Sequence, residues 1–176
     1  MSSILVLKKI ILMNPKNNIA VIIPAAGSST RFGGNISKQF IKIGNETVIE
    51  TSVKKFMEIE FVRKVYVAVD QHETLIKSQS FINHPKVSIT SGGSSRSESV
   101  YNAVLAVDDN IDIVIIHDAA RPWVTQEFIH ELFLEFMKDQ SIHGLYPVIS
   151  INDSLRKKQG DNLIPVDRED FFSIQT

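Results

Sequence analysis

A run of small residues followed by cations could bind phosphate. The sequence reads IIPAAGSSTRFGG from 22 to 34, directly after an apolar run, and a Lys-Gln pair follows at 38 and 39. Small residues let the backbone approach a ligand, and successive amides can hydrogen-bond phosphate oxygens. Arg31 adds a planar fork of donors and Lys38 a mobile charge. An ordinary glycine- and serine-rich surface loop is the alternative. Neither the P-loop pattern nor the G-x-G-x-x-G dinucleotide pattern occurs here.

A second candidate loop, SGGSSRSES, spans 91–99 and leads into a segment with helical spacing. Its glycines would allow a flat base to lie against the backbone near Gly93. The hydroxyls of Ser94 and Ser99 could reach the edge of a heterocycle. A serine-capped loop without any ligand is the alternative interpretation.

The third candidate loop, HDAARP at 117–122, directly follows the apolar run 113–116. Asp118 could reach Mg²⁺ or a substrate hydroxyl, because Mg²⁺ in proteins commonly combines one or two carboxylates with substrate phosphates. Arg121 could bind a second phosphate. The alternative is an internal Asp118–Arg121 ion pair that supports the loop. His117 has no second ligand at metal spacing, so we expect a packed or hydrogen-bonded side chain.

The elements that position these loops alternate along the chain. Short apolar or β-branched runs predict buried strands at 19–23, 65–69, 87–89, 113–116 and 145–149. Segments with helical apolar spacing lie between them, around 48–57, 100–105 and 128–136. This alternation predicts an α/β domain whose mainly parallel sheet is covered on both faces. Ligands bind at the carboxyl ends of such strands, where all three loops stand.

Composition narrows the class of protein. The chain has 176 residues, 43% of them hydrophobic, which favours a single domain over 19–176. A net charge of −1 gives no reason to expect a nucleic acid or an anionic membrane as partner. Without cysteine there is no disulfide framework, which suits a cytoplasmic location. Residues 1–18 are expected to be a disordered or loosely packed extension, and Met13 is an alternative start.

Seven motifs together, in order and at matching intervals, resemble the 2-C-methyl-D-erythritol 4-phosphate cytidylyltransferases. They are PAAG-x-x-x-R, KQ, GG-x-x-R-x-x-S, HDAARP, Asp153-Ser154, VDR and the terminal QT. The resemblance covers about 19–176. It implies the nucleotide-diphospho-sugar transferase fold, a Rossmann-like α/β/α sandwich with a mainly parallel sheet and a protruding β-arm.

The resemblance also implies a reaction. The family transfers CMP from CTP to 2-C-methyl-D-erythritol 4-phosphate in the non-mevalonate isoprenoid pathway. The products are 4-diphosphocytidyl-2-C-methyl-D-erythritol and pyrophosphate, and Mg²⁺ or another divalent cation bridges the CTP phosphates. The partners implied are therefore CTP and a sugar-alcohol phosphate.

Matched position by position, the resemblance assigns roles. Arg31 and Lys38 correspond to transition-state stabilisers, and Arg168 joins the catalytic set. The nucleotide contacts implied are Ala25, Ala26, Gly27, Gly93, Ser94 and Ser99. Asp118 corresponds to the metal and substrate carboxylate, and the groups around the acceptor phosphate are Asp118, Arg121, Ser154 and Arg168. Ser94 departs from the aspartate of many members, and Ser154 from their usual threonine.

The resemblance finally bears on assembly and completeness. The arm, at about 149–168, crosses to a second subunit in the family, which implies a homodimer whose sites share Ser154 and Arg168. The family continues beyond the position of Thr176, so we expect this chain alone to be catalytically incomplete. Two alternatives remain: a ribitol 5-phosphate cytidylyltransferase, and a nucleotide-binding fragment without full activity.

Overall fold

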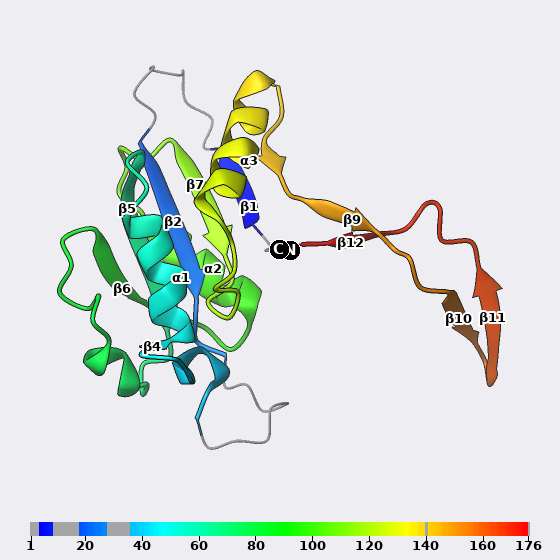
Figure 1. The fold of residues 1–176 in the computed structure, drawn as a ribbon, viewed down its shortest axis with the longest axis horizontal. Helices are drawn as coiled ribbons and strands as arrows, with labels where there is room; N and C mark the ends of the chain where they lie inside the picture. Colours follow the sequence, from blue (N-terminus) through cyan, green and yellow to red (C-terminus); the bar gives the residue numbers. More distant parts are fainter. Residues whose placement is uncertain (1–3, 9–17, 28–35, 140, 176) are drawn as a thin grey trace.

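A computed structural model describes residues 4–8, 18–27, 36–139 and 141–175. Its main sheet has the strand order β6-β5-β2-β7-β1-β8 (Figure 1). The strands are β1 (Ile4–Lys8), β2 (Ile19–Pro24), β5 (Val62–Val69), β6 (Val87–Ser91), β7 (Ile113–His117) and β8 (Gly144–Leu145). The four strands β6, β5, β2 and β7 run parallel, as predicted.

The centre of the sheet is β2, which pairs with β5 on one side and β7 on the other. Every residue from Ile19 to Ile23 is fully buried. Successive side chains of a strand point to opposite faces, so a continuous apolar run requires that both faces be covered.

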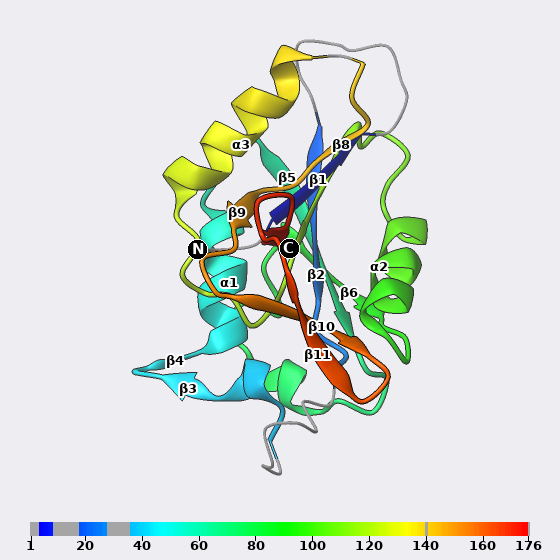
Figure 2. The same cartoon turned by 90° about the vertical axis from the view of Figure 1, so that its right-hand side faces the viewer.

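Helices supply that cover. They are α1 (Val48–Met57), α2 (Arg96–Leu105) and α3 (Gln126–Lys138). Figure 2 shows α1 and α3 on one face of the sheet and α2 on the other. Ile19, Val21 and Ile23 join the core on the α1 and α3 side, whereas Ala20 and Ile22 pack with Ala103 of α2. The expected α/β/α sandwich is confirmed.

The segment β1 corrects one expectation. The sequence predicts a disordered or loosely packed extension over 1–18, but Ile4–Lys8 pair antiparallel with both β7 and β8. The physical reason is that β7 would otherwise present a row of unpaired backbone groups, which a further strand can satisfy. Residues 1–3 and 9–17 lie outside the described residues.

The strand predicted at 145–149 is also different in the structure. It divides into β8, which belongs to the main sheet, and β9 (Val148–Ser150), which does not. Pro147 stands at the break, and proline has no backbone N–H to donate to a ladder. The chain therefore leaves the sheet here and enters the predicted arm.

The arm consists of two small antiparallel pairs. One joins β9 to β12 (Phe172–Ile174), and the other joins β10 (Leu155–Gln159) to β11 (Asn162–Val166). The tight turn after β10 uses Gly160 at a φ of 61°, a conformation that favours glycine. Figure 1 shows this arm reaching away from the sheet. It is longer than the predicted 149–168, because β12 returns beside β9.

Short elements complete the domain. They are the 3-10 helices η2 (Lys38–Phe40) and η3 (Leu75–Ser78), and the strand pair β3 (Lys42–Ile43) and β4 (Glu46–Thr47). In the described part of the chain, none of the helices has both the length and the apolar character that crossing a membrane requires.

Candidate active site

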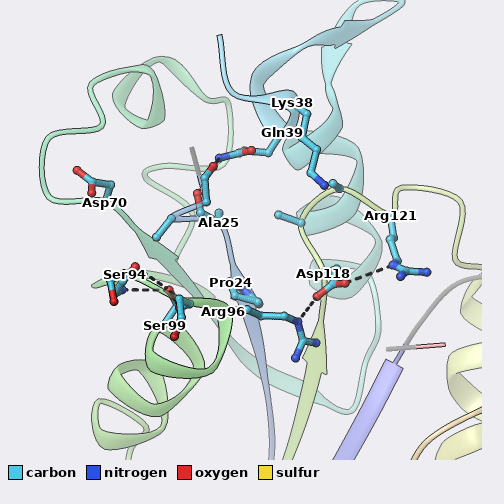
Figure 3. Close-up of a pocket in the computed structure, with 16 residues that line it drawn as sticks. Pro24, Ala25, Lys38, Gln39, Asp70, Ser94, Arg96, Ser99, Asp118 and Arg121 are labelled. Carbon is cyan, nitrogen blue, oxygen red and sulfur yellow. Dashed lines mark hydrogen bonds and ion pairs between the residues drawn. The ribbon is translucent and has the colours of Figure 1, made fainter. Parts of the chain in front are cut away.

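A pocket of about 910 Å³ lies at the carboxyl ends of β2 and β7. The three candidate loops meet there. The predicted site residues that line it are Ala25, Ala26, Gly27, Lys38, Gly93, Ser94, Ser99, Asp118 and Arg121. Figure 3 shows Lys38 and Gln39 approaching from the side opposite Arg96. The parallel sheet thus gathers loops that are far apart in the sequence, as the carboxyl-end rule predicts.

The start of the first loop, at Ala25 and Gly27, is hydrogen-bonded to β5 and to Gln39. The Ala25 N–H donates to Ala68 O of β5 at 2.7 Å. The amide nitrogen of Gln39 donates to Ala25 O at 2.8 Å and to Gly27 O at 3.1 Å. Gln39 is only 4% exposed, so these bonds form largely out of water. The Lys-Gln pair in the sequence predicts no role for Gln39, and these bonds make it a support of the first loop.

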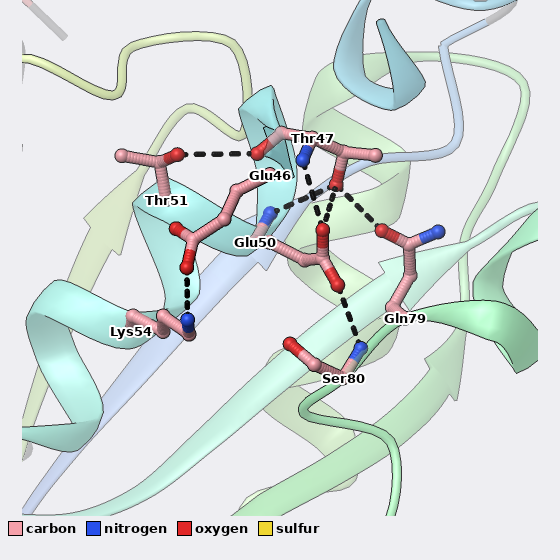
Figure 4. A network of polar contacts seen from close by, with 7 residues as sticks. All are labelled: Glu46, Thr47, Glu50, Thr51, Lys54, Gln79 and Ser80. Atoms are coloured by element: carbon pink, nitrogen blue, oxygen red, sulfur yellow. Dashed lines mark hydrogen bonds and ion pairs between the residues drawn. The ribbon is translucent and has the colours of Figure 1, made fainter. Parts of the chain in front are cut away.

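A separate polar network joins the N-terminus of α1 to the segment that follows η3 (Figure 4). Thr47 caps α1 and forms a capping box with Glu50. The Thr47 hydroxyl also donates to Gln79 Oε1 at 2.6 Å, and the Ser80 N–H donates to Glu50 Oε1 at 2.7 Å. Burial raises the pKa of Glu50, but the hydrogen bonds from Ser80 and Thr47 outweigh it and hold the pKa below its ordinary value.

The second loop is held by side chains of the helix that follows it. The Gly93 N–H donates to Ser99 Oγ at 3.0 Å, and Ser99 Oγ donates to Ser95 O at 2.8 Å. Because Ser99 is 2% exposed and bonded in this way, it shapes the loop from beneath. Ser94 is exposed, and its N–H and hydroxyl donate to Glu98 Oε2 at 2.7 and 2.6 Å. These bonds from the Ser94 side chain and backbone lower the pKa of Glu98.

The first two loops touch at a glycine. A Cβ atom at Gly92 would lie 2.3 Å from the Ala26 Cβ and 3.1 Å from Val69 O. The Gly92 N–H donates to Val69 O at 2.7 Å, and Asn102 donates to Gly92 O at 3.1 Å. Only a residue without a side chain fits between these atoms, so Gly92 sets how closely the loops approach.

The third loop centres on Asp118, which stands between two arginines (Figure 3). Arg96 Nε donates to Asp118 Oδ1 at 2.7 Å, and Arg121 Nε lies 3.3 Å from Oδ2. The alternative of an Asp118–Arg121 ion pair is therefore present, extended by Arg96. His117 is fully buried, 5.0 Å from the Phe56 ring, with its Nε2 3.0 Å from Arg121 O. The expectation of a packed, hydrogen-bonded histidine is confirmed.

The described residues do not form a metal centre. No group of three or more His, Cys, Asp or Glu side chains stands close enough together, within the described ranges, to hold a metal ion. Asp70 and Asp118 line the pocket, but both Asp118 oxygens already accept from guanidinium groups. The donor set therefore does not fit a divalent cation held by the protein alone, and Asp118 as a Mg²⁺ ligand stays a prediction.

Two predicted residues do not line this pocket. Ser154 and Arg168 lie in the exposed arm, where an Arg168 guanidinium nitrogen donates to Asn152 O. Arg31 lies outside the described residues. Sequence reasoning also missed Asp70, Arg96, Glu98 and Asn102. Asp70 directly follows β5, so the same strand-end reasoning that selected Asp118 could have found it.

Fold and pocket together define a class of protein, an α/β/α sandwich with a ligand pocket at the carboxyl edge of its parallel sheet. Residues 19–176 match the sequence model of one family, 2-C-methyl-D-erythritol 4-phosphate cytidylyltransferase (IspD). The chain belongs to this family.

Individual relatives agree with that assignment. The chain is 34% identical to the cytidylyltransferase of that name from Caldanaerobacter subterraneus subsp. tengcongensis, over 90% of this chain and 71% of the relative. It is also 34% identical to the one from Wigglesworthia glossinidia brevipalpis, over 81% of this chain and 61% of that one.

Solved structures show the same fold. The Francisella tularensis enzyme of that name superposes with a TM-score of 0.71 at 28% identity, covering 91% of this chain and 70% of its own. The one from Thermus thermophilus gives 0.66 at 26% identity, covering 90% and 68%. The chain therefore spans roughly two thirds of the length of the relatives that it matches.

Proposed function

We propose that this chain carries the nucleotide-binding part of an enzyme that transfers CMP from CTP to 2-C-methyl-D-erythritol 4-phosphate. The observation that carries the proposal is the convergence of the three loops on one pocket with Lys38, Arg96 and Arg121 at its wall. Family membership supports the cytidylyl transfer, and HDAARP and VDR favour this acceptor over ribitol 5-phosphate.

The chemistry proposed is an in-line displacement. A phosphate oxygen of the acceptor forms a bond to the α-phosphorus of CTP, while the bond from that phosphorus to the bridging oxygen of pyrophosphate breaks. The electron pair leaves with pyrophosphate, and no covalent enzyme intermediate is needed. The protein positions two anions and neutralises the charge that develops on the phosphoryl oxygens. Lys38 and Arg31 would carry that role.

The residues around the nucleotide follow from the same proposal. Backbone groups of Ala25, Ala26, Gly27 and Gly93 would face CTP, with Ser94 at the rim and Ser99 shaping the loop beneath. Arg121 and Asp118 would face the acceptor. A divalent cation, expected to be Mg²⁺, would enter with the triphosphate, because phosphate oxygens and water are its usual partners in such sites.

The arm supports a homodimer as part of the proposal. Its exposed apolar side chains include Leu163 at 66%, Phe172 at 54% and Ile174 at 51%. An extended strand pair with such a surface is stabilised when a partner covers it. A second copy would place Ser154 and Arg168 at the pocket of the neighbouring subunit. A monomer by light scattering at assay concentration would contradict this arrangement.

The test is pyrophosphate release from CTP and Mg²⁺, with 2-C-methyl-D-erythritol 4-phosphate and ribitol 5-phosphate offered separately. Turnover with the first alone would establish the assignment, and turnover with ribitol 5-phosphate alone would transfer it. No pyrophosphate release with either acceptor, despite CTP binding, would favour a nucleotide-binding fragment. A family-like C-terminal extension that restored turnover would then show that the chemistry is right and the chain incomplete. A cytoplasmic location stays a prediction.

A further inference from the structure

Arg96 occupies an unusual position for a cation. It is the first residue of α2, directly after the N-cap Ser95. The amide groups at a helix N-terminus carry partial positive charge, so acidic side chains are favoured there and basic ones are not. A cation in this position needs a compensating partner, and Asp118 of the third loop provides one across the pocket.

Both arginines that contact Asp118 do so through Nε alone. Arg96 and Arg121 each reach Asp118 through Nε, and each uses a different carboxylate oxygen. For neither arginine does the described part of the chain show a hydrogen-bond acceptor at the terminal guanidinium nitrogens. The Arg96 side chain remains 43% exposed and that of Asp118 24% exposed. An arginine fork normally binds an oxyanion through two parallel N–H groups, and Arg96 uses only one of its five N–H donors on Asp118, so the four on its terminal nitrogens can reach a ligand.

The charge of the pocket points to the kind of ligand. Among the described residues, Lys38, Arg96 and Arg121 line it together with two carboxylates, Asp70 and Asp118. One of those carboxylates, Asp118, is shared between two guanidinium groups. The local excess is therefore cationic, in a chain whose overall net charge is −1. An anion with several oxygens, such as a phosphate chain, complements this wall.

We propose that Arg96 is a substrate-binding residue whose terminal N–H groups bind the phosphate chain of the nucleotide, and that Asp118 is the positioning residue that aims it. This rests on the proposed function, and it deepens that function by adding a phosphate contact from the second loop. The loop that holds the base would then also hold the triphosphate. Asp118 acts through its two arginines.

The experiment measures equilibrium binding of CTP and of cytidine to the full chain, without metal and with Mg²⁺. The variants are Arg96→Ala, Arg96→Lys and Asp118→Asn. The matched control is Arg63→Ala, because Arg63 is exposed near the amino end of β5, away from the pocket edge. A thermal unfolding midpoint measured for each variant identifies any loss of fold.

We expect the changes at Arg96 to weaken binding of the nucleotide CTP but not of the nucleoside cytidine. Arg96→Ala should weaken CTP binding by about ten- to a hundredfold, the range for a charge-assisted contact, with cytidine binding unchanged. Arg96→Lys should be intermediate, since lysine keeps the positive charge but lacks the planar fork whose separate nitrogens can reach Asp118 and a phosphate. Asp118→Asn should also weaken CTP binding, and adding it to Arg96→Ala should cost little more, because the two changes remove one linked interaction. The Mg²⁺ concentration dependence of CTP binding should be unchanged by Asp118→Asn.

Four outcomes would overturn the proposal. Arg96→Ala could bind CTP as tightly as Arg63→Ala does, so that Arg96 makes no contact. Arg96→Ala or Arg96→Lys could weaken cytidine as much as CTP, which would make Arg96 a support of the base loop only. An altered Mg²⁺ dependence in Asp118→Asn would return Asp118 to the role of metal ligand. If the unaltered chain bound neither CTP nor cytidine, the proposed function would fall and the Arg96 assignment with it. If the unaltered chain bound CTP and Arg96→Ala bound it equally well, only the role of Arg96 would fall, and the proposed function would stand.

Discussion

The pocket loops and the arm are both polar connections that follow strands, but they are held in opposite ways. The loops at the pocket are bonded to the sheet and to each other, as with Ala25 N to Ala68 O and Gly92 N to Val69 O, both 2.7 Å. The strands β10 and β11 pair only with each other in the described sheets, and nearly all of their residues are exposed. One region takes its shape from the core, and the other has no core behind it.

This difference indicates which site residues the domain positions by itself and which need a partner surface. The described side chains at the pocket sit on backbone that is hydrogen-bonded to the domain core. The arm has few buried apolar contacts, which places it at the low end of local stability. Its residues Ser154 and Arg168 would reach a defined position only when a partner surface covers the arm. Four changes would break or sharpen this comparison.

The largest effect is expected at Lys38, on the pocket side. Lys38→Ala should lower turnover by about a hundred- to a thousandfold with little change in CTP affinity, because its proposed partner is charge that develops in the transition state. Steady-state kinetics and CTP binding measure the two quantities. Lys42→Ala, an exposed lysine on β3, is the matched control. Equal turnover in the two variants would refute the role.

The next effect is expected at Gln39, which links the first loop to η2. Gln39→Leu keeps most of the volume but leaves the carbonyls of Ala25 and Gly27 without their donor. We expect a loss of about 1–3 kcal/mol in the free energy of unfolding, together with weaker CTP binding. Denaturant unfolding and CTP titration measure these. Unchanged CTP binding would show that the loop is shaped without Gln39.

A smaller, pH-dependent effect is expected at Glu50. Its folded pKa is lowered by hydrogen bonds that outweigh burial, so its stabilisation is full above the unfolded pKa of about 4.3. That stabilisation is lost as the pH falls through the lower folded value. Glu50→Gln should therefore reduce stability by about 1 kcal/mol at neutral pH and flatten the acid decline. Unfolding between pH 7 and pH 3 tests this, with exposed Glu60→Gln as control; parallel acid declines in the two variants would contradict it.

The smallest effect on the domain is expected in the arm. Leu163→Lys should change the free energy of unfolding by less than about 0.5 kcal/mol, because this side chain is 66% exposed. The same change should weaken self-association, measured by sedimentation. Leu105→Lys on α2, at 69% exposure, is the control that should leave association unchanged. A large stability loss from Leu163→Lys would mean that the arm packs on its own domain.

The sequence predicted the part of the fold that depends on local pattern. The apolar run at 19–23 indicates a strand covered on both faces, and the carboxyl-end rule then brings Lys38, Gly93 and Asp118 to one pocket. The break at Pro147 is also readable from the sequence, because proline cannot continue a ladder. If Pro147 is ignored, the apolar pattern predicts one strand at 145–149, whereas the structure has the two strands β8 and β9.

Other features depend on contacts that no sequence pattern displays. The role of Gln39 follows from where two carbonyl groups point, and that of Arg96 from the distance between α2 and the loop after β7. The strand β1 resembles an extension in the sequence because Lys8 and Lys9 end its apolar run, and its pairing partner lies far along the chain. Arg31, Ser154 and Arg168 stay predictions.

The pairing of Ile4 with His117 has a consequence for how the chain acquires its structure. Because β1 precedes β7 and β8 in the chain, it can pair with them only after they have been made, and closing so long a loop carries an entropic cost before any contact repays it. We expect β1 to dock late in folding. Until then, the β7 edge of the nascent sheet stands open to other chains.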